Sequence, residues 1–198
     1  MWKYIIKYIL TLRYIKLLSY ISAKHIQESR QESHKRRYTY YYGFQFIYGA
    51  FTKFILLILL GLIFNILPQI LLVMFSFVSL RIWIGGLHFD SYVKCAYISL
   101  LTFIIVALSA KYIYLNQFVS MVIFLFIFSI ILKYAPVEHP NRPLKNNDKI
   151  KFKLIALIAL IVLFLVNIFS DNIVIKNSVP YGALLSGIIS LPFISKIK

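Results

Sequence analysis

Residues 38–80 read YTYYYGFQFIYGAFTKFILLILLGLIFNILPQILLVMFSFVSL, and Lys53 is the only charged residue among them. One membrane-crossing helix needs about 20 apolar residues. This run of 43 residues therefore predicts a hairpin of two spanning helices that turns near Asn65–Pro68. A chain that contains such a hairpin is an integral membrane protein.

The remaining apolar runs predict four more spans. The third begins near Val93 and runs to about Ala110, and the fourth covers roughly Ile113 to Leu132. A polar, basic loop over residues 133–153 separates these from the last two spans, at about 154–170 and 178–195. We expect an all-α membrane protein with about six transmembrane helices, no cleavable signal peptide, and two regions: a basic amphipathic segment (1–37) and a transmembrane domain (38–198).

Composition and charge agree with this class. Charged residues make up 14% of the chain, against about 25% in soluble domains. The net charge of +16 is typical of basic cytoplasmic loops, and we expect no nucleic-acid partner. Residues 1–20 predict an interfacial basic helix on the cytoplasmic leaflet, and residues 24–37 a polar cytoplasmic segment before the first span.

The distribution of lysine and arginine predicts the orientation. If the N-terminus is inside, 19 of the 22 Lys and Arg residues lie on the cytoplasmic side, Lys53 lies within a span, and only Lys111 and Lys176 lie outside. The positive-inside rule then places both termini in the cytoplasm of a multi-pass cell-membrane protein. Residues 81–95 lie on the same side, where the cytosol keeps thiols reduced.

The polar break between the second and third spans holds the candidate chemistry. Residues 81–95 read RIWIGGLHFDSYVKC and end on Cys95, the only cysteine of the chain. Cysteine and histidine are the minimal pair for thiol nucleophilic catalysis, because the imidazole can take the thiol proton. In one straight helix His88 and Cys95 would lie about 10 Å apart. A working pair therefore requires His88 to fold back, which a helix break at Gly85-Gly86 allows, with Asp90 or Ser91 capping the next helix and Cys95 near its first turn.

Three further residues are candidate supporting groups, each with a plainer interpretation. Ser91 can orient the imidazole or donate to an oxyanion, or it can be the helix cap. Arg81 can bind a substrate carboxylate, or it can reach the lipid headgroups. Glu138 lies in the proline-rich stretch YAPVEHPNRPL (134–144), which is either a connector or a stiff rim that holds an extended peptide. One cysteine and scattered histidines give no metal-ligand spacing, so we expect no metal and no cofactor.

Two of these stretches together resemble the accessory gene regulator protein B family. The pattern is Arg-x-x-x-Gly-Gly-x-His-x-x-Ser-x-x-x-Cys over residues 81–95, followed by Tyr-Ala-Pro and Arg-Pro-Leu within 134–144. The resemblance implies a bacterial membrane cysteine endopeptidase of quorum sensing, with His88 and Cys95 as its catalytic residues. It also implies a partner, a short propeptide similar to accessory gene regulator D, which is cleaved at its C-terminal side and closed into a thiolactone or lactone ring.

Two rival functions remain open from the residues alone. One is a non-catalytic transporter or peptide-export subunit in which Cys95 is structural, and the other is an acyltransferase that uses Cys95 without cutting a peptide. We also expect a homodimer, because six short spans enclose little volume. The segment Gly182–Gly187 is either its helix-helix seam or internal packing.

Overall fold

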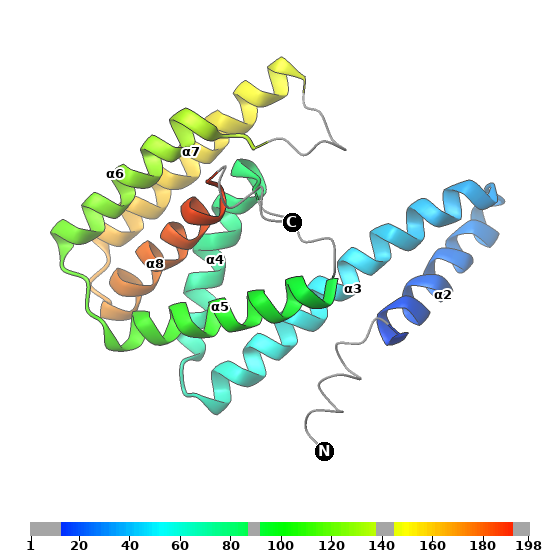
Figure 1. The fold of residues 1–198 in the computed structure, drawn as a ribbon, viewed down its shortest axis with the longest axis horizontal. Helices are drawn as coiled ribbons and strands as arrows, with labels where there is room; N and C mark the ends of the chain where they lie inside the picture. The colour runs from blue at the N-terminus through cyan, green and yellow to red at the C-terminus, as the bar shows by residue number, and fades with distance from the viewer. Residues whose placement is uncertain (1–12, 87–91, 138–144, 192–198) are drawn as a thin grey trace. The chain divides into compact units, whose positions relative to one another are not determined.

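The computed structural model of the 198-residue chain describes residues 13–86, 92–137 and 145–191. These residues form seven helices and no extended strand: α2 Arg13–Arg30, α3 His34–Ile63, α4 Leu67–Ile84, α5 Tyr92–Tyr112, α6 Gln117–Tyr134, α7 Asn146–Phe169 and α8 Ile173–Ile189 (Figure 1). Five are long and apolar enough to cross a membrane, and α8, with 17 residues, is a shorter apolar helix. The all-α membrane fold is thereby confirmed.

The chain divides into two compact units. One comprises Met1–Leu57 with Asp90–Leu100, and the other comprises Ile58–Phe89 with Leu101–Lys198. The division into residues 1–37 and 38–198 remains a prediction.

In the first unit, α2 and the start of α3 form a helical hairpin. The hydroxyls of Ser22 and Tyr48 lie 2.7 Å apart across it. At its turn the Glu32 carboxylate accepts hydrogen bonds from Tyr40 at 2.6 Å and from Arg36 at 2.8 Å. The hydrogen bond from Tyr40 is the main reason that the pKa of Glu32 lies below its ordinary value. Most of the segment 24–37, predicted as a polar cytoplasmic segment before the first span, is therefore helical.

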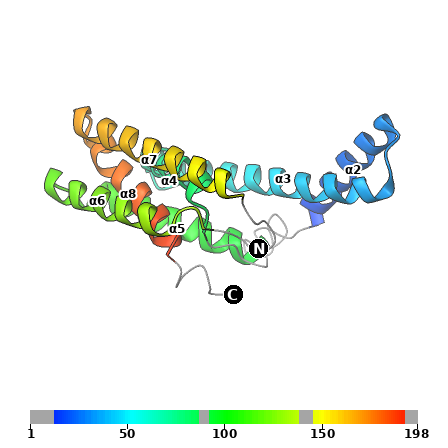
Figure 2. The same ribbon diagram turned by 90° about the horizontal axis from the view of Figure 1, so that it is seen from above.

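In the second unit, α4, α6, α7 and α8 form a bundle, and Figures 1 and 2 both show these four helices side by side. Its core contains Leu80 and Ile84 of α4, Ile127 of α6, Leu160 of α7 and Val179 of α8. α8 packs against the other three, and most of its residues from Asn177 to Gly187 are buried. Within a membrane such contact depends on close packing, since lipid tails are as apolar as the side chains.

Small residues allow α8 to approach its neighbours closely. A Cβ at Gly182 would meet the Ser76 side chain of α4 at 2.8 Å, and one at Gly187 would meet Ile127 of α6 at 3.2 Å. Ser186, between them, is fully buried. The Gly182–Gly187 segment therefore serves packing inside one subunit, which is the second of the two roles predicted for it. The homodimer itself remains a prediction.

Helix boundaries differ most from the expectation at the starts of α7 and α8, and α6 begins at Gln117 rather than near Ile113. The predicted loop 133–153 is too long, because α7 begins at Asn146 and carries Lys149, Lys151 and Lys153 in its first two turns. Lysine is a good helix former, so a basic stretch at a membrane edge can be helical. α8 runs from Ile173 to Ile189 rather than over 178–195. Its start is capped by the Asn172 side chain, which accepts from the Val174 amide at 2.8 Å, and Pro192 disfavours its continuation.

A proline inside α8 is compensated by a neighbouring helix. Pro180 has no amide hydrogen, so the carbonyl of Lys176, four residues earlier, loses its partner within the helix. Nδ2 of Asn167, a 1% exposed residue on α7, donates to that carbonyl at 2.8 Å. One buried amide thus satisfies the carbonyl that the proline leaves unpaired and holds α7 against α8.

We predict that Asn167→Leu lowers the free energy of unfolding by about 1 kcal/mol, since the Lys176 carbonyl is left without a donor. In Asn167→Leu/Pro180→Ala the backbone amide restored at position 180 can bond that carbonyl, so most of the loss should be recovered. Thermal unfolding of the detergent-solubilised protein measures both effects. Equal stability of the single and the double variant would contradict this role for Asn167.

Candidate active site

The end of α4 is held by its own arginine. α4 ends at Ile84, and the backbone then turns through Gly85 and Gly86 at φ values of 77° and 127°. Nη1 of Arg81 donates a hydrogen bond to the carbonyl oxygen of Gly85, one turn further on. The helix break predicted at the two glycines is confirmed. Arg81, predicted to bind a substrate carboxylate or the headgroups, here contacts the backbone of that break.

The C-terminal end of α8 reaches the same carbonyl. The Ser190 hydroxyl is fully buried and lies 3.2 Å from the Gly85 oxygen and 2.7 Å from the Ser186 oxygen, so its single proton is shared between them. Residues 85 and 190 are 105 positions apart. No local pattern marks a serine at a helix end as the partner of so distant a glycine, so sequence reasoning missed Ser190.

The start of the proline-rich stretch is attached to the end of α4 as well. The Val137 amide donates to the Ile84 carbonyl at 2.8 Å, and Val137 and Gly85 form an isolated parallel bridge. A Cβ on Gly85 would come within 2.6 Å of the Val137 oxygen, so no other residue fits there without displacing the chain. The segment that leads to His88 therefore starts beside Ile84 and Gly85. Hydrogen bonds at these two residues join α4, the C-terminal end of α8 and Val137, which follows α6.

Cys95 is the fourth residue of α5, which begins at Tyr92. Its thiol is half-buried and lies 3.9 Å from the hydroxyl of Ser99, one turn further along the same helix. The prediction that Cys95 stands near the first turn of this helix is confirmed.

Three predicted site residues lie outside the residues that the structure describes: His88, Ser91 and Glu138. Of the predicted supporting groups only Arg81 is described. The pairing of His88 with Cys95 and the supporting roles of Ser91, Arg81 and Glu138 therefore stay predictions. The described residues give the break that precedes His88 and the helix turn that carries Cys95.

Comparison with protein families identifies the chain. The family model Accessory gene regulator B, AgrB, matches residues 14–193, which include all the helices described above except the first residue of α2. The chain belongs to the AgrB family. Members of this family are linked to the processing of quorum-sensing peptides. The match covers both the polar break and the bundle.

Individual AgrB relatives share between a quarter and a third of their residues with this chain. AgrB-like protein 2 of Clostridium perfringens is 27% identical over 144 residues, covering 69% of this chain and 67% of the relative. An AgrB-like protein of Clostridium acetobutylicum is 26% identical and covers 78% and 75%, respectively. One of Clostridium beijerinckii is 33% identical over 62% of this chain and 63% of its own length. No solved structure matches.

We predict that Gly85→Ala in this AgrB protein loosens the attachment between α4 and Val137. The positive φ and the contact with the Val137 oxygen together should cost roughly 1–3 kcal/mol. Hydrogen exchange reads the effect directly, because the Val137 amide should exchange faster when its bond to Ile84 is disturbed. Gly43→Ala is the matched control, since a Cβ there meets nothing within 4 Å. An unchanged Val137 exchange rate in Gly85→Ala would refute this account.

Proposed function

We propose that this chain is a membrane-embedded cysteine endopeptidase that cleaves a short quorum-sensing propeptide at its C-terminal side. Cys95 is the nucleophile and His88 the general base. The observation that carries the proposal is the single thiol of the chain, half-buried in the first turns of α5 and seven residues after a histidine. Membership of the AgrB family supports it, because that family is linked to peptide processing.

The first step is transfer of the propeptide acyl group to the enzyme. His88 removes the Cys95 proton, and the thiolate attacks the scissile carbonyl carbon. As the C–N bond breaks, the imidazolium returns its proton to the leaving amine. The products are a thioester between Cys95 and the N-terminal part of the propeptide, and a free C-terminal peptide.

The second step is ring closure. A cysteine thiol within the bound propeptide gives its proton to His88 and attacks the thioester carbonyl. A new thioester forms as the bond to Cys95 breaks, and the leaving Cys95 thiolate takes the proton back from the imidazolium. One thioester replaces another, so the exchange needs no ATP. Tethering gives the internal thiol a high effective concentration, and a site poor in water limits hydrolysis. A serine hydroxyl in place of the thiol would give a lactone.

The supporting residues have distinct roles in this proposal. Arg81 acts as a positioning residue, because its bond to the Gly85 carbonyl fixes the backbone from which the His88 segment departs. Ser91 orients the imidazole or caps α5, and Glu138 lies in the rim that holds the extended peptide. The substrate partner is an accessory gene regulator D-like propeptide that reaches the site from the same membrane leaflet.

We predict that Cys95→Ala and His88→Ala each abolish propeptide cleavage while protein levels stay near normal. Cys95→Ser should still bind the propeptide and leave it uncut, because the hydroxyl is a far weaker nucleophile. Ser99→Ala is the matched control: it removes the hydroxyl that lies 3.9 Å from the thiol and should retain cleavage. Cleavage is measured by mass spectrometry of a co-expressed propeptide.

Two outcomes would contradict the proposed chemistry. Residual cleavage above about a few per cent in Cys95→Ala would place the nucleophile elsewhere. Peptide export that continues unchanged in Cys95→Ala, with no cleavage in the unaltered protein, would identify a transporter instead.

The proposed orientation places the site in the reducing cytosol. Within the second unit, one end of the helices carries Arg81, Lys133, Lys145, Lys149, Lys151 and Lys153, and the other carries Lys111 and Lys176. The Lys111 ammonium is bonded to the Asn65 carbonyl at 2.9 Å, which joins the ends of α5 and α3 on the sparsely charged side. This asymmetry supports a basic cytoplasmic end.

Labelling of single cysteines in a Cys95→Ala background tests the orientation. Cysteines at positions 30, 90, 145 and 198 should react only with reagents that enter the cell, whereas those at 111 and 176 should react from outside. A cysteine at position 145 that reacts from outside would reverse the proposed topology and remove the argument for a reduced thiol.

A further inference from the structure

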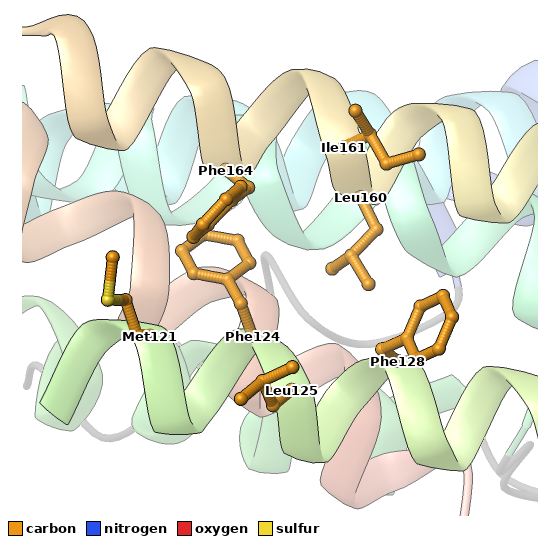
Figure 3. Close-up of a pocket in the computed structure, with 7 residues that line it drawn as sticks. All are labelled: Met121, Phe124, Leu125, Phe128, Leu160, Ile161 and Phe164. Carbon is orange, nitrogen blue, oxygen red and sulfur yellow. The ribbon is translucent and has the colours of Figure 1, made fainter. Parts of the chain in front are cut away.

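Two hollows follow the seam between α6 and α7. The first is lined by apolar side chains, has a volume of about 240 Å³ and includes Phe124, Leu125 and Phe128 of α6 and Leu160, Ile161 and Phe164 of α7 (Figure 3). Leu125 and Ile161 are 66% and 51% exposed, so the hollow opens on the outer surface of the bundle. On a membrane helix this surface faces the hydrocarbon of the bilayer.

The second hollow is basic and lies at the end of the same two helices. Its volume is about 540 Å³, and three of its lining residues are lysines: Lys133 of α6 and Lys149 and Lys153 of α7. The Lys153 ammonium donates to the Leu132 carbonyl in the last turn of α6, which fixes its position and leaves two of its three N–H groups for another acceptor. Three lysines therefore line a space large enough for a phosphate group with a glycerol attached.

The two hollows share one face of α7. The basic hollow is lined by residues 149, 150 and 153, and the apolar hollow by residues 160, 161 and 164. Each residue of the second set follows its counterpart by 11 positions, which is three helical turns and about 16 Å along the axis. A single elongated molecule can therefore lie along this face, with its charged end at the end of the helix and its apolar end toward the middle of the bilayer.

We propose that an anionic phospholipid binds along this seam, with its phosphate on Lys133, Lys149 and Lys153 and one acyl chain in the apolar hollow. Lysines at the edge of a membrane helix attract anionic headgroups, and basic pockets between helices are suited to them. An acidic peptide would satisfy the lysines but would not use the apolar hollow. The proposal is independent of the thiol chemistry and holds for the resting protein.

Lipid binding to the purified, full-length protein in a non-ionic detergent tests the proposal. Dioleoyl phosphatidylglycerol is the anionic probe and dioleoyl phosphatidylcholine the zwitterionic one, with affinities measured by native mass spectrometry. We expect the anionic lipid to bind about tenfold more tightly or better. Lys149→Gln/Lys153→Gln should remove most of that preference, since each lysine near the headgroup contributes a several-fold effect.

Matched variants distinguish binding at a specific site from non-specific attraction to positive charge or to an apolar surface. Lys145→Gln/Lys151→Gln removes the same charge from two exposed lysines that do not line the hollow and should leave the preference within about twofold. Ile161→Trp fills the apolar hollow and should lower the affinity for the anionic lipid. Ile158→Trp, at an exposed position of α7 outside the hollow, should leave that affinity unchanged. Lys149→Gln alone gives a smaller loss and covers the case in which the double variant fails to fold.

Three results would overturn the proposal. The first is equal binding of the two lipids, and the second is an equal loss in both double-lysine variants. The third is lysine-dependent binding of an octaglutamate peptide that displaces phosphatidylglycerol and is unaffected by Ile161→Trp, which would make the basic hollow a peptide site.

Discussion

The carbonyl oxygen of Gly85 accepts hydrogen bonds from the side chains of Arg81 and Ser190, and the end of α4, where the chain leaves toward His88, depends on this one acceptor. A helix end leaves carbonyls without partners, and a buried one must be satisfied by other groups. Here the donors come from the last turn of α4 and from the end of α8. The Val137 amide donates to the neighbouring Ile84 carbonyl. Three segments therefore meet where the chain leaves the bundle toward His88.

Satisfaction of backbone carbonyls is the common principle of the second unit. Asn167 bonds the carbonyl that Pro180 leaves unpaired, and Asn177, 5% exposed, donates to the Ala110 carbonyl while accepting from the Leu115 amide. Lys111 and Lys153 cap carbonyls at opposite ends of the helices. Where water is scarce, polar side chains that would be ordinary in a soluble protein become the groups that join one helix to the next.

Much of this architecture could be predicted from local patterns. The hairpin turn is marked by Asn65, which adopts a positive φ, and by Pro68 at the first turn of α4. The break at Gly85-Gly86 and the position of Cys95 in α5 follow from the same kind of signal. The start of α7 could not be predicted well from hydropathy. The apolar pattern begins only after the lysines of the first turns, whereas the helix already includes them. The hydrogen bonds of Asn167 and Ser190 could not be predicted, because no local sequence pattern pairs these residues with their partners Lys176 and Gly85.

The candidate chemistry shows the same division. A lone cysteine and a nearby histidine in a polar break are compatible with thiol catalysis and equally with a structural cysteine. The resemblance of residues 81–95 and 134–144 to the accessory gene regulator protein B pattern is what favours catalysis. The hydrogen bond from Arg81 to the Gly85 carbonyl was not foreseen from its charge, although a cation near a helix end has a carbonyl within reach of its own side chain. Its two predicted roles stay predictions. The sequence shows which polar side chains are present. Only the folded structure shows which of them are hydrogen-bonded to the backbone.

The long sequence separation between Gly85 and Ser190 has a consequence for synthesis. A ribosome that adds about 5–20 residues per second needs roughly 5–20 s to pass from one to the other. Throughout that interval α4 is made and α8 is not, so the end of α4 lacks the partner supplied by α8. The end of α4 can assume its final form only after nearly the whole polypeptide has been translated. Until then, the segment that leads to His88 departs from a helix end that lacks one of its two side-chain donors.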